Sequence, residues 1–334
     1  MALATDEIDK KQIYQAVAEF AQPDLGQAIW QLVNTLVPYI ALWAAMVIML
    51  KQGVSYWLVL PLIVLAAGFL VRLFIIFHDC CHLSFFKSRQ ANRLVGYITG
   101  LLAFTPYDQW QHSHAVHHAT VGNLDKRGVG DVMTMTVDEY KASSPAQRLF
   151  YRLYRHPIVL LLIGPGLVFF LGHRIPHKDA KPGQRQSVWI VNLLLLGILV
   201  AATFTIGLGT YLAIQVPIMM IAGTAGVWLF YVQHQYENAY WARQDDWDPL
   251  LAALQGSSYY KLPKALQWIT GNIGLHHIHH IQPRVPNYRL QACQDQVSEI
   301  KGVEPITILS GFKSLGLHLW DEERQELVGF RAVR

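Results

Sequence analysis

Four of the five residues from 276 to 280 are histidines, a high density of side chains that bind metals. On a helix, His276, His279 and His280 would occupy positions i, i+3 and i+4, so their three rings could converge on one face. Neutral imidazole is the commonest metal ligand in proteins. Taken alone, the run is also compatible with an exposed histidine tract, and the rest of the chain must discriminate between the two interpretations.

The same spacing recurs earlier in the chain. His114, His117 and His118 repeat the i, i+3, i+4 pattern, and His78 and His82 stand four residues apart at the end of an apolar segment. Two HxxHH motifs and one HxxxH motif, all beside apolar segments, are hard to obtain by chance. Together the three clusters predict a metal site.

A lone histidine, His234, ends another long apolar segment in the way that His78 does, and we predict it to be a further ligand. The candidate ligands are then His78, His82, His114, His117, His118, His234, His276, His279 and His280. A zinc ion takes about four ligands, so this many nitrogens indicate two transition metals with room for water or dioxygen. Imidazole binds iron, zinc, copper and nickel alike, so ligand type alone does not select the metal.

Residues beside the clusters are candidates for orienting the ligand rings. The carboxylates of Asp79, Asp131 and Glu237 could accept hydrogen bonds from His Nδ1–H groups. Three neighbours are predicted to surround the site without binding metal: His112, Asn272 and His277. No catalytic residue beyond the metal ligands is predicted, and no carboxylate bridge is evident in the clusters, unlike in soluble carboxylate di-iron bundles.

Composition indicates a membrane protein. Hydrophobic residues make up 52% of the chain and charged residues 15%, whereas about 25% is the usual charged fraction of globular proteins. The formal charge of +4 is modest and forms no basic stripe, so no nucleic-acid partner is expected. Three cysteines are too few for a disulfide framework and fit reduced thiols facing the cytosol. The N-terminus lacks the pattern of a cleavable signal peptide.

Several apolar segments are long enough to cross a bilayer, which needs about 20 residues. They cover residues 29–50, 54–77, 187–206 and 208–232. Short turns join the first segment to the second and the third to the fourth, so the spans form two helical hairpins. Two other apolar segments, near 94–106 and 157–172, are predicted to lie at the membrane interface. The first is too short to span, and the second has positive charge at both ends.

The predicted fold is an all-α integral membrane protein, a single domain over residues 1–334. Four transmembrane helices would carry a helical cap built from 78–186 and 233–334. With these crossings, all the His clusters and both termini lie on one side of the membrane. A crossing at 157–172 would place the last cluster opposite the first two and would forbid a shared site.

A redox-active pair of metals at a membrane surface suits the oxidation of a long apolar substrate. Breaking an unactivated C–H bond needs an oxidant, which general acid–base chemistry does not provide and a metal cofactor does. The chain has no dinucleotide fingerprint, no haem-attachment motif and no ferredoxin-like cysteine run. Electrons must therefore come from a separate partner.

These clusters resemble those of the membrane fatty acid desaturase family, whose three His boxes read HxxxH or HxxxxH, HxxHH and HxxHH. Beyond the boxes, four segments are similar to bacterial Δ12/Δ5-type acyl-lipid desaturases: HDCCHLSFF, HHATVGNLDKRGVGD, FYVQHQYENAYW and TGNIGLHHIHH. The resemblance covers residues 30–300. In this family a lone histidine between the second and third boxes completes the iron ligands, and His234 occupies the matching place.

The resemblance implies a four-helix membrane anchor, a cytosolic cap and two non-haem irons that cycle between Fe2+ and Fe3+. It further implies O2-dependent insertion of a cis double bond into an acyl chain, with O2 reduced to water. Because no fused cytochrome b5 domain is present, ferredoxin with its reductase is the expected electron donor. The implied location is the bacterial inner membrane, with the His boxes and both termini cytosolic and membrane lipids as neighbours.

Other functions share parts of this pattern. A hydroxylase, an acetylenase or a carotenoid ketolase or hydroxylase could carry the same boxes, since the outcome depends on how the substrate lies beside the irons. The acyl chain could arrive on a lipid, on CoA or on a carrier protein. A metal transporter or storage protein is the alternative outside this chemistry, but transporters place their ligands near the bilayer midplane, whereas these histidines lie at span ends.

Overall fold

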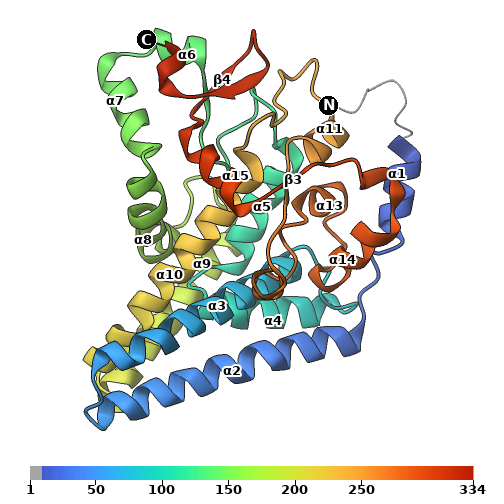
Figure 1. Cartoon of the computed structure of the whole chain (residues 1–334). Coiled ribbons are helices and arrows are strands. Elements are labelled where there is room, and N and C mark those ends of the chain that lie inside the picture. The colour runs from blue at the N-terminus through green and yellow to red at the C-terminus, as the bar shows by residue number, and fades with distance from the viewer. Residues whose placement is uncertain (1–9, 334) are drawn as a thin grey trace.

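The computed structural model describes residues 10–333 and is mostly helical (Figure 1). Four of its helices are long and apolar enough to cross a membrane: α2 (Leu25–Lys51), α3 (Tyr56–Cys81), α9 (Pro182–Phe204) and α10 (Leu208–His234). They overlap the predicted spans throughout, so the expectation of four such helices in two hairpins is confirmed. The largest difference is at the start of α9, which begins at Pro182, five residues before the predicted span. Helices α2, α3 and α10 also extend beyond the apolar residues into polar ones.

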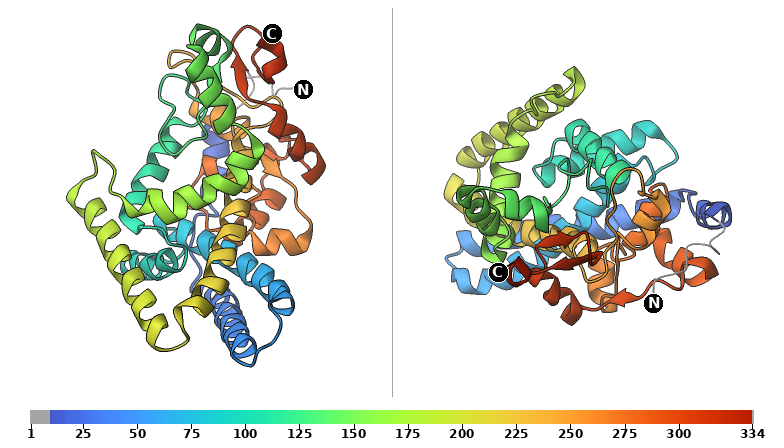
Figure 2. Two further views of the ribbon diagram at one scale, coloured as in Figure 1. Left: turned by 90° about the vertical axis from the view of Figure 1, so that its left-hand side faces the viewer. Right: turned by 90° about the horizontal axis from the view of Figure 1, so that it is seen from above.

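Local sequence sets the limits of the two hairpins. The side chain of Asp24 caps α2, because its Oδ1 accepts a hydrogen bond from the Gln27 backbone N–H at 2.8 Å. Each hairpin turn contains a glycine in the left-handed region, Gly53 with φ +76° and Gly207 with φ +85°, a conformation that side chains with a Cβ disfavour. Both turns lie together at the end of the molecule farthest from the cap (Figures 1 and 2).

Helix α3 is the centre of the helical bundle. It packs against α2, α10 and α4 (Arg89–Leu102), and most of its second half is buried. The outer faces of α2 and α9, by contrast, carry large exposed apolar side chains, among them Ile40, Leu193 and Phe204. Exposed apolar surface of this extent is typical of helices that contact lipid.

The apolar segment predicted at 157–172 is helical from Val159 to Arg174 and meets α7 (Pro145–Tyr154) at a bend of 61°. Its turns are η2 (Val159–Ile163), α8 (Gly164–Gly166), η3 (Leu167–Leu171) and η4 (Gly172–Arg174). By length and composition the bent pair is a broken span or a re-entrant loop. It packs closely on α10 at Gly223, where a Cβ would stand 3.0 Å from the Cβ of Pro165.

The remaining elements form a cap at one end of the long helices (Figure 2). Its helices are α1 (Lys10–Ala18), α5 (Tyr107–Thr120), α6 (Val137–Ala142), α11 (Pro249–Leu254), α12 (Lys264–Ile269), α13 (His276–Ile281), α14 (Asn287–Gln296) and α15 (Ile308–Lys313), with short 3₁₀ turns η5 (Ser298–Ile300), η6 (Ser314–Gly316) and η7 (Phe330–Val333). Both α1 and η7 belong to the cap, so the two described ends of the chain lie on the side of the His clusters.

The prediction of an all-α fold was wrong in one respect, because the cap also contains short strands. β1 (Met135–Thr136) pairs in parallel with β4 (Leu319–Asp321), which pairs antiparallel with β5 (Glu326–Val328). β2 (Tyr259–Tyr260) pairs in parallel with β3 (Pro305–Ile306). Strands of two or three residues are too short to show an alternating pattern, and β1 joins a partner more than 180 residues away.

Candidate metal centre

The nine predicted ligands gather where α3, α5, α10 and α13 meet. They form two groups, and within each group the candidate ligand atoms all lie within 4.8 Å of one another. One group, the five-His group, contains His78, His82, His114, His118 and His279; the other, the four-His group, contains His117, His234, His276 and His280. Because the four helices are distant in sequence, the tertiary fold creates both groups.

Each HxxHH motif contributes to both groups. On α5, His114 and His118 stand one turn apart and enter the five-His group, while His117 enters the four-His group. Helix α13 divides in the opposite sense: its i and i+4 histidines, His276 and His280, enter the four-His group, and the histidine at i+3 enters the five-His group. In each motif the histidines at i and i+4 therefore share one group, and the histidine at i+3 belongs to the other group.

Neighbouring rings approach each other through their Nε2 atoms. In the five-His group the Nε2–Nε2 distance is 3.1 Å for His114–His118 and 3.0 Å for His118–His279. In the four-His group it is 3.1 Å for His117–His234, 3.0 Å for His234–His276 and 3.1 Å for His276–His280. Each group thus presents a set of nitrogen atoms to a shared centre.

This spacing fits metal ions. Neighbouring nitrogens bound at about 2.1 Å and about 90° around one metal lie about 3.0 Å apart. Nδ1 of His117 lies against the Asp131 carboxylate and Nδ1 of His234 against the Gly256 carbonyl, so the lone pairs of their Nε2 atoms face each other at 3.1 Å. Two lone pairs do not form a hydrogen bond, whereas a metal cation accepts both. The Nε2 atom of His82 is buried and has no hydrogen-bond partner among the described residues. The donor set, nitrogen only and without carboxylate, suits a transition metal.

A carboxylate fixes the ring of His78. Its Nδ1 lies 3.1 Å from Oδ1 of Asp79, and Oδ2 of the same carboxylate accepts from Asn287, from the backbone N at 2.7 Å and from Nδ2 at 2.8 Å. A carboxylate only accepts, so His78 carries its proton on Nδ1 and turns the Nε2 lone pair toward the five-His group.

The four-His group has two equivalent supports. Nδ1 of His117 lies 2.6 Å from Oδ1 of Asp131, and Nδ1 of His234 donates to the Gly256 carbonyl at 3.0 Å. Asp131 can reach His117 because Gly130, with φ +72°, brings the loop onto α5. A Cβ at Gly130 would stand 2.9 Å from the Ser113 carbonyl oxygen.

Burial keeps the cap imidazoles neutral. Desolvation, followed by repulsion from the neighbouring rings, holds the pKa values of five histidines on α5 and α13 well below their usual range. These are His114, His118, His276, His279 and His280. Neutral imidazole is the form that binds metal, so these rings are ready for a metal at pH 7 without losing protons.

Aromatic side chains border the histidines on the side of the long helices. The Trp110 ring stacks on His114 with centroids 4.3 Å apart, and Phe77 packs on Trp110 at 5.0 Å. On the other group, Phe230 of α10 lies 5.1 Å from His117. These aromatic rings form a border that gives the histidines an apolar neighbourhood on this side.

The residues predicted to orient the ligands fall into two sets. Asp79 and Asp131 contact the rings of candidate ligands directly, at His78 and His117. Glu237 does not: it is exposed in the turn after α10, where the chain leaves the site, and no hydrogen bond or ion pair between described residues joins it to an imidazole. His112 is likewise exposed, because it lies on α5 between the positions that face inward.

Two further predicted neighbours, His277 and Asn272, do not contact the nine histidines through their polar atoms. His277 is buried but points away from the metal groups, with Nε2 3.1 Å from Oε1 of Gln294, and burial lowers its pKa to about 4. Asn272 donates from Nδ2 to the backbone carbonyl of Asn287 at 3.1 Å and so helps to hold the residue that orients Asp79. The sequence had given no indication of Gln294, Asn287 or the Gly256 carbonyl, since amide residues and backbone oxygens carry no recognisable spacing.

The Asp131–His117 contact leads to a prediction. We expect Asp131→Ala to lower metal affinity or activity by about 10- to 100-fold, the usual loss when a partner of a metal-bound imidazole is removed. Metal titration of the purified variant measures this. Asp125→Ala, in the same loop but paired at the surface with Arg243, should leave metal affinity unchanged, and equal losses in the two variants would refute the orienting role.

The chain was compared with known proteins. The family model described as "Fatty acid desaturase" matches residues 55–302. The chain is 47% identical to a Bacillus subtilis (strain 168) fatty acid desaturase over 325 residues, 97% of this chain and 92% of the relative. It is 30% identical over 74% of its length to the sn-1 acyl-lipid omega-3 desaturase (ferredoxin) of Synechocystis, covering 69% of that protein. The Synechocystis sn-1 oleoyl-lipid 12-desaturase is 27% identical over 77% of this chain and 76% of that protein.

The family match covers most of the chain, including all nine candidate ligands and the helices that carry them. The matched residues also include three of the four long apolar helices, α3, α9 and α10. The chain belongs to the fatty acid desaturase family.

Proposed function

We propose that this chain is an O2-dependent desaturase that introduces a cis double bond into an acyl chain of a membrane lipid. The observation that carries the proposal is the pair of abutting all-histidine groups at the ends of α3 and α10, directly beside the aromatic border. A centre of this kind lies at the level where acyl chains of a membrane would reach the cap.

The nine histidines would hold two non-haem irons, one in each group. Bound there, the irons would supply the oxidising power to remove two hydrogens from adjacent carbons. In the balanced reaction the acyl chain gives up two hydrogen atoms, and O2 takes these with two electrons and two protons to become two waters. The protein would supply neutral imidazole ligands, carboxylates that fix the orientation of the rings, and an aromatic border that excludes water.

The aromatic border would position the acyl chain. Trp110 and Phe77 come from α5 and α3, which also carry ligands, so the apolar surface and the metal groups are built on the same helices. Sharing rigid helices fixes the distance between a bound methylene and the centre. A cavity of about 850 Å³ lies beside His82 of the five-His group, and Arg93, Asp108 and Lys181 are among its polar lining residues.

The two electrons would come from a separate protein. The name of the Synechocystis omega-3 relative specifies ferredoxin, and we propose ferredoxin with its reductase as the donor here too. The four apolar helices would cross the bacterial inner membrane with the cap, the His groups and both termini in the cytosol. The buried, unbridged thiols of Cys80, Cys81 and Cys293 are compatible with that reducing compartment.

Product analysis tests this proposal. A bacterial host that lacks desaturases would express the chain together with a ferredoxin and its reductase, and its lipid acyl chains would be analysed by gas chromatography–mass spectrometry. We expect a new cis-unsaturated acyl chain that depends on O2. A hydroxylated product, or an unchanged acyl profile with the donor present, would overturn the proposal.

A further inference from the structure

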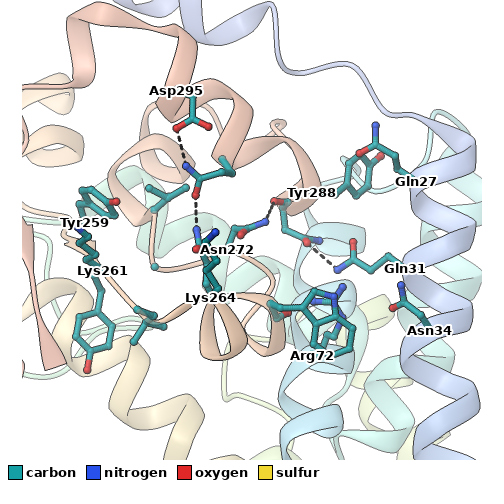
Figure 3. Close-up of a pocket in the computed structure, with 18 of the residues that line it drawn as sticks. Gln27, Gln31, Asn34, Arg72, Tyr259, Lys261, Lys264, Asn272, Tyr288 and Asp295 are labelled. Carbon is teal, nitrogen blue, oxygen red and sulfur yellow. Dashed lines mark hydrogen bonds between the residues drawn. The ribbon is translucent and has the colours of Figure 1, made fainter.

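A polar pocket of about 660 Å³ lies behind the metal centre, where the first turns of α2 meet the cap (Figure 3). Its walls come from α2, α3, α12 and α14, and Figure 3 shows Gln27, Gln31 and Asn34 along α2 facing Arg72 and the cap residues. These three positions follow i, i+4, i+7, so one stripe of an otherwise apolar helix is polar. None of the nine histidines lines this pocket; it meets the metal centre only through Asn272 and Asn287, which hold Asp79.

Arg72 is a buried cation on α3 without a carboxylate partner. It is 6% exposed; its Nε donates to Thr35 Oγ1 at 3.0 Å, its Nη1 donates to the Trp268 carbonyl, and its guanidinium lies 4.0 Å from the centre of the Trp268 ring. All these partners are neutral, and no ion pair involves Arg72 within residues 10–333. A buried charge within an apolar helix is costly unless a counter-charge reaches it.

Two lysines add to this positive charge. Lys261 and Lys264 line the same pocket, both are exposed, and neither side chain has a hydrogen-bond or ion-pair partner among the described residues. Asp295 also lines the pocket and accepts from Gln291 Nε2 at 2.8 Å. Its described lining therefore has three cations and one carboxylate, which favours an anionic ligand.

Gln31 presents an acceptor to the same space. Because Asn287 Nδ2 donates to the Asp79 carboxylate, Asn287 Oδ1 must face the other way, where it accepts from Gln31 Nε2 at 2.8 Å. Gln31 is 3% exposed, and this arrangement leaves its Oε1 buried and without a partner in the described chain. The fitting ligand therefore offers a hydrogen-bond donor as well as a negative charge.

The rim of the pocket indicates where the ligand comes from. Trp30 of α2 and Trp268 of α12 line the pocket and are 67% and 43% exposed, and tryptophan gathers at the headgroup level of membranes. We propose that this pocket binds the phosphate-bearing headgroup of a membrane glycerophospholipid. The phosphate lies among Arg72, Lys261 and Lys264, and a hydroxyl or ammonium of the headgroup donates to Gln31 Oε1. The inference rests on the membrane location proposed above and not on the reaction.

Lipid binding to the full chain in detergent micelles tests this site. The probes are dihexanoyl-phosphatidylglycerol, dihexanoylglycerol, which has the same chains without phosphate, and inorganic phosphate, with Kd measured by native mass spectrometry or calorimetry. We expect Lys261→Gln with Lys264→Gln to weaken binding of the phospholipid by about 10-fold or more. The matched pair Lys301→Gln with Lys313→Gln, exposed lysines elsewhere on the cap, should leave Kd unchanged.

A third variant, Arg72→Gln, removes the buried cation but could fail to fold. The lysine double variant still tests the site, because neither lysine side chain has a hydrogen-bond or ion-pair partner among the described residues. An unchanged Kd in the lysine variant overturns the proposal. Equal affinity for dihexanoylglycerol shows that phosphate is not recognised, and equal affinity for inorganic phosphate shows a free-phosphate site; either result also overturns it. Binding is measured without turnover, so the two proposals can fail separately. A protein that binds phospholipid but forms no product would refute only the desaturase proposal. A protein that forms product but does not bind phospholipid in this pocket would refute only the headgroup site.

Discussion

Replacing His279 with alanine should abolish product formation. The His279 side chain is buried, its Nε2 lies 3.0 Å from Nε2 of His118, and its ring contacts that of His78 at 4.4 Å between centroids. The substitution removes the contribution of α13 to the five-His group. Losing an outer partner of a ligand costs about 10- to 100-fold, so losing the ligand itself should exceed about 100-fold. Product yield and the metal content of the purified variant measure the effect.

Two histidines outside the groups serve as controls for His279→Ala. His112 is exposed on α5, and His318 packs on Phe330 at 4.3 Å within the cap. His112→Ala and His318→Ala should keep both metals and normal product. If His279→Ala behaved as they do, His279 would not be a ligand.

Replacing His234 with alanine should lower product formation as much as His279→Ala does. His234 is the contribution of α10 to the four-His group, and its Nε2 approaches both His117, at 3.1 Å, and His276, at 3.0 Å. Three ligands would remain in that group, with a gap at its centre. We expect loss of the metal from this group, retention of the other, and a fall in activity of more than about 100-fold. Metal-to-protein stoichiometry separates this outcome from unfolding, which would release both metals.

The control for His234→Ala is a buried histidine that lies between ligands in sequence but faces away from them. His277→Asn removes the contact with Gln294, which should cost about 1 kcal/mol of stability and leave both metals bound. Loss of one metal from His277→Asn, or two retained metals in His234→Ala, would contradict the assignment of the four-His group.

Features with a local cause could be predicted from the sequence. The long helices follow from uninterrupted apolar length, and the hairpins follow from Gly53 and Gly207 between such segments. The ligand candidates follow from i, i+4 spacing, because residues one turn apart share a face whatever the tertiary fold does. Asp79, next to His78, and Asp131, in the loop after α5, were candidate partners because they lie near ligand candidates in the sequence.

Features caused by tertiary packing could not be predicted. The division of each HxxHH motif between two groups depends on how α5 and α13 face each other, since either group is within reach of an i+3 histidine. Asn287 orients Asp79 although the two residues are 208 positions apart in the sequence. The spacing of residues on one helix cannot predict such a contact. Glu237 failed as a candidate because the chain turns outward directly after α10, at Asn238 with its φ of +66°.

The central claim is that two groups of histidines hold two irons. Elemental analysis by inductively coupled plasma mass spectrometry on the tag-free, purified full chain, expressed with iron supplied, tests it most directly. We predict about two irons per chain, as one metal per group requires. One metal per chain, or zinc in place of iron in a preparation that is active, would contradict it.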